Sequence, residues 1–337
     1  MRSFREAALG GKAEAEKKTF HDARLKEDLE ALVDPFVRGD PESSLRWVGN
    51  STRRLSAELG RQGHSVSHCL VGRLLRELEY SLQANRKTAE GAGDHPDRDA
   101  QFRYIFRKTA LFRRQRQPVV SVDTKKKENV GNYKNSGREY RRKGSPRKVR
   151  MHDFSGPLDK VAPYGVYDVP LNNGLVNVGI SHDTAEFAVA SLRRWWEMMG
   201  SVSYPKARKL LVTADGGGSN GYRVRLWKTE LQGLANGIGK AIHVSHYPPG
   251  TSKWNKIEHR MFNAISENWR GIPLTDYETI VSLLNHTTTE KGLEIRGVLD
   301  ERTYEKGKKI SDEELASVNI YKYAFHGEWN YKISPQK

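Results

Sequence analysis

The sequence predicts an α/β protein with a mixed β-sheet, preceded by a small all-helical region. In the second half of the chain, short runs rich in β-branched residues alternate with amphipathic segments, which is typical of α/β proteins. Two alternating runs are joined by Asn172-Asn173-Gly174, a hairpin signal. Near residue 70, apolar residues recur at helical spacing. Together these patterns predict helices first and a five-stranded mixed sheet after them.

The expected strands and helices follow one another in a definite order. Strands are predicted at 118–122, 164–169, 175–181, 209–214 and 241–246, and helices at 184–199, 222–235 and 252–269. The first three strands meander, and the later strands alternate with helices. The chain is therefore not a run of uniform βαβ units.

Residues 51–83 read as two helices around a short break that contains Gly63. The second helix has apolar residues at i, i+3, i+4 and i+7, namely Val71, Leu74, Leu75 and Leu78. A helix, a glycine-containing turn and an Arg-bearing second helix outline a helix-turn-helix. Arg73 and Arg76 would lie on its polar face. Any helical hairpin can show this pattern. The prediction that these helices bind DNA therefore also depends on the basic stretch that follows them in the sequence.

The positive charge is concentrated in one stretch. The chain has a formal net charge of +16, and residues 101–150 contain 17 Lys and Arg against 3 Asp and Glu. A local basic field of this kind is typical of proteins that bind nucleic acid, because neutralised phosphates release counterions. The alternative is a solvated basic loop that keeps the protein soluble. The concentration of charge favours nucleic acid.

The composition excludes several other classes of protein. No run of 18 apolar residues is present, and the first residues lack the apolar core of a secretory signal. The single cysteine, Cys69, excludes an intrachain disulfide framework and a multi-cysteine zinc site. A lone cysteine fits a reducing cytoplasm.

The changes in composition predict five segments. These are a charged and partly disordered N-terminal segment (1–45), a helix-turn-helix domain (46–82), a linker (83–117), a catalytic domain (118–285) with a basic insertion (124–162), and a C-terminal extension (286–337).

Three acidic residues occupy positions suited to a shared site. Asp123 ends the first strand, Asp215 ends the fourth, and Glu258 lies in the last core helix. Sites in open α/β sheets form at strand ends, and a helix crossing there can bring Glu258 to the same place. Three carboxylates without cysteine suit Mg²⁺ or Mn²⁺. Taken singly, Asp123 could cap a turn, Asp215 could cap the following helix, and Glu258 could pair with Arg260 or face solvent.

The glycines after Asp215 raise a different possibility. Gly216, Gly218 and Gly221 match G-x-G-x-x-G, the fingerprint of a dinucleotide site. That fingerprint follows the first strand of its domain and leads to an acidic residue at the end of the next strand. Here it follows the fourth strand, and the next one ends in Ser245-His246. The context argues against a dinucleotide site, and the glycines are interpreted as a tight turn that lets DNA and metal approach.

Three longer blocks carry a family resemblance. SVDTKKKENVGNYKNSGREY, TADGGGSNGYRVRLW and PPGTSKWNKIEHRMFNAISENW, in this order, resemble the DDE transposases of the ISAzo-type insertion sequences, relatives of the mariner-like group. The resemblance extends from Arg46 to Tyr331. It implies an RNase H-like catalytic core, with Asp123, Asp215 and Glu258 as the catalytic triad that binds two Mg²⁺ or Mn²⁺ ions.

The resemblance also implies an activity and partners. The family cleaves DNA at transposon ends and joins the freed 3′-OH to target DNA. The expected partner is double-stranded DNA, bound by a protein dimer in the bacterial cytoplasm at the nucleoid. The alternatives are a truncated, non-mobilising DNA-binding remnant and a host nuclease of the same fold. The residues expected to contact DNA are Lys125, Lys126, Lys127, Arg73, Arg76, Arg141, Arg142, Lys143, Lys253 and Lys256.

Overall fold

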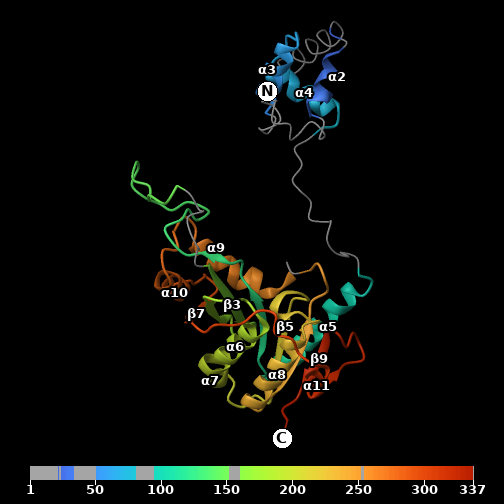
Figure 1. The fold of residues 1–337 in the computed structure, drawn as a ribbon, viewed down its shortest axis with the longest axis vertical. Helices are drawn as coiled ribbons and strands as arrows, with labels where there is room; N and C mark the ends of the chain where they lie inside the picture. The colour runs from blue at the N-terminus through green and yellow to red at the C-terminus, as the bar shows by residue number, and fades with distance from the viewer. Residues whose placement is uncertain are drawn as a thin grey trace. The chain divides into compact units, whose positions relative to one another are not determined.

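The computed structural model describes residues 22, 24–33, 51–80, 95–151, 160–251 and 254–336 (Figure 1). The chain divides into two compact units, residues 1–87 and 88–337. Most of the expected charged segment 1–45 and the expected DNA-binding residue Lys253 lie outside the described residues.

The first unit is helical, as the sequence predicts. It contains α2 (Leu25–Val33), α3 (Thr52–Arg61) and α4 (His68–Glu77). Helix α4 begins after Ser67, whose side chain accepts a hydrogen bond from the Leu70 amide at 3.3 Å. The three helices bury one apolar cluster, formed by Leu25, Leu29, Leu55, Leu59, Leu70, Val71 and Leu74. Helix α2 thus adds a third helix to the expected pair.

His64 ties the α3–α4 turn to the region of α2. Its two ring nitrogens lie 2.7 Å from Asp22 Oδ2 and 2.8 Å from Asp28 Oδ2. The hydrogen bond to Asp22 raises the pKa of His64 above its ordinary value of 6.5, burial opposes this, and the bond to Asp28 adds to it. Both contacts therefore favour the charged imidazolium.

We expect the helical unit to lose stability as the pH rises. A raised pKa in the folded state means that the stabilisation is complete below the unfolded value and disappears as the pH rises through the folded value. NMR titration of the His64 ring should give a pKa above 6.5, and thermal unfolding of this unit should shift to lower temperature over the same pH range. In His64→Gln the pH dependence should be much weaker. An ordinary His64 pKa would contradict this prediction.

The second unit is built on one mixed sheet. Its strands are β1 (Val119–Thr124), β2 (Glu128–Asn129), β3 (Lys160–Asp168), β4 (Asn173–Gly179), β5 (Lys209–Ala214), β6 (Ala241–His246), β7 (Glu294–Asp300), β8 (Ile320–Lys322) and β9 (Asn330–Ile333). Their order is β7-β4-β3-β1-β5-β6-β9-β8, with β2 paired to β3. Strands β1, β5 and β6 are parallel, and β3 is antiparallel to both β1 and β4.

The five predicted strands form the centre of this sheet. Their order, β4-β3-β1-β5-β6, with the second strand antiparallel, is the RNase H-like arrangement. Two of them, β5 and β6, have the predicted bounds. The predicted hairpin joins β3 to β4, and Asn172 adopts φ 55° there, the left-handed region that asparagine tolerates. The RNase H-like fold is confirmed.

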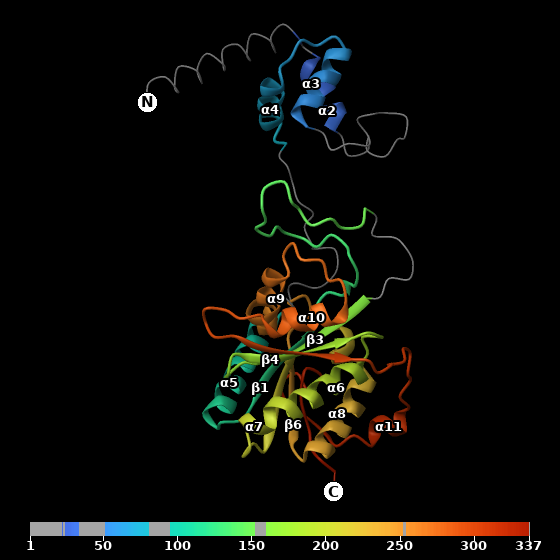
Figure 2. The same ribbon diagram turned by 90° about the vertical axis from the view of Figure 1, so that its left-hand side faces the viewer.

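Helices cover both faces of the sheet (Figure 2). The α-helices of this unit are α5 (Arg98–Arg114), α6 (Ala185–Trp195), α7 (Ser201–Ser203), α8 (Arg225–Ile238), α9 (Asn263–Asn268), α10 (Tyr277–Asn285) and α11 (Asp312–Ala316). The π-turn η2 (Trp196–Gly200) joins α6 to α7, and the π-turn η5 (Glu258–Phe262) leads into α9. The 3₁₀ turn η3 (Gly218–Asn220) precedes α8. Helices α6 and α8 pack on one face, and η5, α9 and α10 pack on the other. Trp195, Trp196 and Trp227 are all buried. Among the described helices, none combines the length and apolar composition that a membrane span requires.

Two predicted segments differ from the structure. Residues 83–117 were expected to be a linker, but 98–114 form α5. The fully buried Gln101 of this helix donates to His246 O at 2.8 Å. Residues 286–337 were expected to extend beyond the catalytic domain, but they supply β7, β8 and β9 to its sheet. Both segments are polar overall, so their few buried residues give only a weak periodic signal.

Candidate active site

Asp123 and Asp215 lie side by side at one edge of the sheet. Strands β1 and β5 are parallel, and Val122 is in register with Ala214. The next residue of each chain segment therefore lies at the same edge. Both carboxylates line one cleft of about 630 Å³, together with the glycine loop that begins at Gly216 and the turn at residues 248–250.

Glu258 reaches this edge because its helix packs very close to β3. Gly165 lies opposite Asp123 in the β1–β3 pairing. A Cβ atom at position 165 would lie 2.6 Å from Phe262 and 2.7 Å from Ile257 and Met261. Only glycine leaves room for this helix, and its first turn carries Glu258 to the end of β1.

A buried hydrogen-bond network fixes Asp215 and the start of this helix. The Asn255 side-chain amide donates to Asp215 Oδ1 and to Val122 O, both at 3.0 Å. The Ser121 hydroxyl donates to Asn255 Oδ1 and accepts from the Ile257 amide at 3.1 Å. Ser121 and Asn255 are both fully buried. The network thus connects β1, Asp215 and the residue before Glu258.

A second series of hydrogen bonds holds the backbone of Asp215. His246 Nδ1 lies 2.9 Å from Asp215 O, and Nε2 lies 3.0 Å from the Tyr331 hydroxyl. A carbonyl only accepts, so Nδ1 carries the proton and Nε2 accepts from Tyr331, which in turn accepts from Trp227 Nε1 at 2.9 Å. Burial lowers the pKa of His246 to about 4, so the ring is neutral. These contacts give His246 a structural role at the site.

The three acidic residues repel one another electrostatically. Burial raises the pKa of Asp123, and the negative charges of Asp215 and Glu258 raise it further. Burial also raises the pKa of Asp215, against the hydrogen bond from Asn255. Burial raises the pKa of Glu258 too, while His259 and Lys125 oppose this. The fold therefore holds these carboxylates where their charges are unfavourable, a common property of functional sites.

The donor set fits a hard divalent cation. Carboxylate oxygens are the preferred ligands of Mg²⁺ and Mn²⁺, and a bound cation offsets the repulsion among them. In the part of the chain that the structure describes, no three His, Cys, Asp or Glu side chains are grouped closely enough to hold one ion in common. Asp123 interacts with both Asp215 and Glu258, so each acidic pair remains available to a cation.

The glycine loop leaves the cleft open beside the two aspartates. Added Cβ atoms at Gly217 and Gly218 would meet nothing within 4 Å, and Gly218 has φ 69°. The loop forms the short turn η3 before α8 begins at Arg225. It therefore shapes the cleft without filling it, in agreement with its interpretation as a tight turn.

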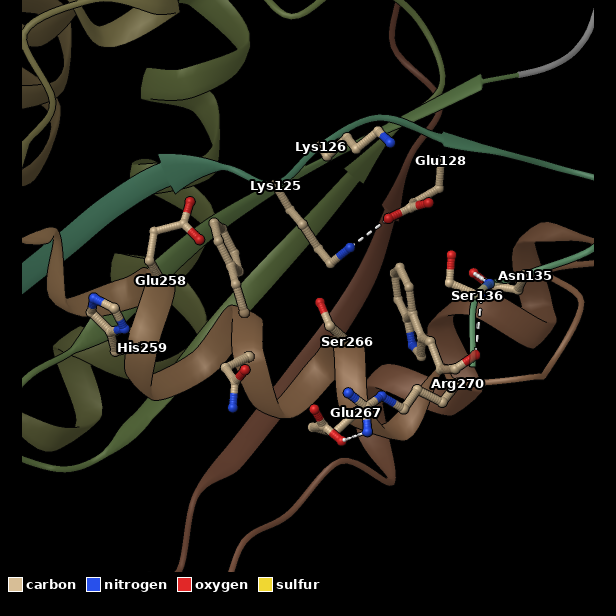
Figure 3. Close-up of a pocket in the computed structure, with 13 residues that line it drawn as sticks. Lys125, Lys126, Glu128, Asn135, Ser136, Glu258, His259, Ser266, Glu267 and Arg270 are labelled. Atoms are coloured by element: carbon tan, nitrogen blue, oxygen red, sulfur yellow. Dashed lines mark hydrogen bonds and ion pairs between the residues drawn. The ribbon is translucent and has the colours of Figure 1, made fainter. Parts of the chain in front are cut away.

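A second cleft, of about 760 Å³, begins at Glu258 and follows η5 and α9 (Figure 3). Lys125 and Lys126 line it from the end of β1. The Lys125 ammonium is ion-paired with Glu128 and lies 4.7 Å from the centre of the Trp269 ring. Asp123 and Asp215 line the first cleft and Glu258 lines the second, and the charge of Glu258 acts on Asp123.

The residues expected to bind DNA differ in their exposure to solvent. Lys125 is nearly buried and paired with Glu128, and its contact with DNA stays a prediction. Arg73 is half-buried on α4. The remaining described residues are exposed, namely Arg76, Lys126, Lys127, Arg141, Arg142, Lys143 and Lys256. Arg141 is ion-paired with Glu139 at 3.3 Å.

Several supporting residues have no clear signal in the sequence. Four residues contact the acidic residues or the elements that position them, yet the sequence shows each as an ordinary strand or loop residue. They are Ser121, Gly165, Asn255 and Tyr331. Asn255 lies three residues before Glu258, and this spacing is the one local signal that could have been used. The roles of the other three residues can be recognised only when the pairing of the strands is known.

The chain is similar in structure to the Mos1 transposase paired-end complex with left transposon end, at 14% identity and a TM-score of 0.42, covering 77% of this chain and 69% of that one. A Mos1 mariner paired end complex with Mn gives 15% identity, a TM-score of 0.39 and coverages of 77% and 69%. No curated protein matches.

The match to a protein family is far more extensive. The transposase family described as the Rhodopirellula transposase DDE domain matches residues 28–335, a range that includes Asp123, Asp215 and Glu258 and every strand of the sheet. Such a match covers both the carboxylates and the elements that position them, and the chain accordingly belongs to the Rhodopirellula transposase DDE domain family.

Proposed function

We propose that the chain is an insertion-sequence transposase that cleaves DNA at the ends of its element and joins the freed 3′-OH to target DNA. The observation that carries the proposal is the position of Asp123 and Asp215 at one sheet edge, with the charge of Glu258 acting on Asp123, in a chain of this family. We further propose that it acts as a dimer on double-stranded DNA, at the nucleoid in the bacterial cytoplasm.

The proposed roles of the three residues follow from their positions. Asp123 and Asp215 would hold divalent cations from the end of the parallel strands, and Glu258 would do so from the helix above β3. Two such ions, when bound, activate the attacking oxygen and stabilise charge on the phosphate and the leaving oxygen. Asn255 and His246 would keep Asp215 in place, and the open glycine loop would admit the DNA backbone.

The exposed basic residues of segment 124–151 would bind DNA phosphates. Replacing Arg142 and Lys143 by alanine should weaken DNA binding and reduce the slope of log affinity against log salt by about 2, one unit for each phosphate that is no longer neutralised. Binding would be measured by fluorescence anisotropy at several salt concentrations. The control is the double replacement of Lys306 and Lys309 by alanine, because both are also exposed and their replacement removes the same charge. Equal effects in both variants would contradict a local DNA contact.

The decisive experiment uses purified protein and DNA that carries the terminal repeats of the element. With Mg²⁺ or Mn²⁺, the protein should nick the 3′ ends and form strand-transfer products. A DNA-binding remnant would bind in a salt-sensitive manner without cleavage. A host nuclease would cleave without joining and without regard to the end sequence. Either result would overturn the proposed function.

A further inference from the structure

A fourth acidic residue lies beside the three candidate catalytic carboxylates. Asp183 follows β4 and precedes Thr184, the residue that caps α6. The α6 cap is formed by the Thr184 hydroxyl, which accepts from the Phe187 amide at 3.3 Å. The negative charge of Asp183 acts on Asp123. Asp183 is therefore placed at the site from an element that supplies none of the other three acidic residues.

Asp183 is half-buried, and one of its carboxylate oxygens is incompletely hydrogen-bonded. Within the described residues, its Oδ1 atom is shielded from solvent and has no hydrogen-bond partner. An unpaired buried carboxylate oxygen is costly and normally finds a donor. Helix capping does not explain this atom, because Thr184 makes that bond. A cation or its bound water would offset the cost.

Tyr164 provides a second, independent observation at the same place. It is fully buried on β3, in register with Thr124, the residue after Asp123. In the part of the chain that the structure describes, its hydroxyl also has no hydrogen-bond partner. Burial raises its pKa well above 10, and the charges of Asp123, Asp183 and Asp215 add to this effect. The charges of three carboxylates thus act on a buried hydroxyl that has no partner in the described part of the chain.

These two incomplete groups have one common explanation. Both belong to elements fixed by the sheet, β3 and the β4–α6 connection, and both interact with Asp123. A purely structural pair would be expected to satisfy its own hydrogen bonds. Groups that bind a cation and its water molecules are completed only when these are present.

We infer that Asp183 is a fourth carboxylate of the cation site, and that Asp183 and Tyr164 complete the site on the side of Asp123. This inference rests on the proposed function, because it takes the three acidic residues to bind divalent cations. Asp183 would increase the negative charge that attracts the cations, and Tyr164 would hydrogen-bond to their bound water.

The test is direct measurement of Mn²⁺ binding to the full-length protein without DNA. Free Mn²⁺ would be followed by electron paramagnetic resonance during a titration, together with the rise in unfolding temperature that Mn²⁺ produces. Asp183→Asn should weaken Mn²⁺ binding about tenfold, as loss of a group that supports metal ligands does, and should reduce the rise in unfolding temperature. The control is Glu186→Gln in the first turn of α6, where Glu186 pairs with Lys308. It removes the same charge and should leave Mn²⁺ binding unchanged.

Two further variants distinguish failure of this inference from failure of the proposed function. Tyr164→Phe should also weaken Mn²⁺ binding, and it decides the matter if Asp183→Asn does not fold. If Asp123→Asn abolishes binding while Asp183→Asn and Tyr164→Phe bind normally, this inference is overturned and the proposed function stands. If Asp123→Asn itself binds Mn²⁺ normally, the proposed cation site is wrong as well.

Discussion

Replacing Asp215 by asparagine is expected to reduce metal-dependent DNA cleavage by at least about 1,000-fold. The amide keeps the shape of the side chain but removes its charge, so it is a poor ligand for Mg²⁺ or Mn²⁺. Several kcal/mol of transition-state stabilisation depend on the bound cations, and about 1.4 kcal/mol corresponds to a factor of ten in rate. The fold should survive, because the asparagine oxygen can still accept the hydrogen bond from Asn255.

Cleavage of labelled terminal-repeat DNA under single-turnover conditions measures this effect. Asp312→Asn is the matched control, since Asp312 lies on α11, is 84% exposed and pairs with Arg225. The Asp215 variant should unfold at the same temperature as the unmodified protein or higher, because burial and Glu258 disfavour the charged carboxylate that it removes. Full cleavage activity in Asp215→Asn would show that the active site is elsewhere.

The parts of the fold that could be predicted are those with strong local patterns. Strands β5 and β6 are short, apolar and β-branched, and each is followed by a turn or helix signal, so their bounds agree with the sequence. Asp123 and Asp215 could be selected because each is polar where an apolar strand ends. Glu258 could be added because it lies in the last core helix, which can cross the same strand ends.

The parts that could not be predicted depend on contacts between distant segments. Ser121 and Asn255 are buried polar residues whose role is to bond each other, 134 positions apart. Nothing in the residues around either one indicates the partner. Asp183 could not be selected from the sequence, because its incomplete hydrogen bonding is visible only when β3 and β4 are in place.

The C-terminal strands also depend on contacts between distant segments, and Asp300 makes several of these contacts. Asp300 ends β7, in the segment that was expected to lie outside the catalytic domain, and its side chain is fully buried. Its oxygens accept from Arg302 at 2.8 and 2.6 Å, from Asn177 at 2.9 Å and from Tyr304 at 2.9 Å. Burial alone would raise the pKa of Asp300, but these bonds outweigh it and hold the pKa well below its usual value of 3.8.

Asp300→Ala is expected to destabilise the catalytic unit by about 3 kcal/mol, because it leaves Asn177, Arg302 and Tyr304 without their shared acceptor. The cost is at the lower end for a broken buried ion pair, since the Arg302 side chain is 54% exposed. Urea unfolding at neutral pH measures it, with Glu301→Ala, an exposed neighbour of the same charge, as the control. A lowered folded pKa gives stability that is present above 3.8 and lost as the pH falls through the folded value, so the difference between the variant and the unmodified protein should shrink in acid. Equal urea midpoints for the two proteins at neutral pH would mean that β7 is not held to the sheet through Asp300.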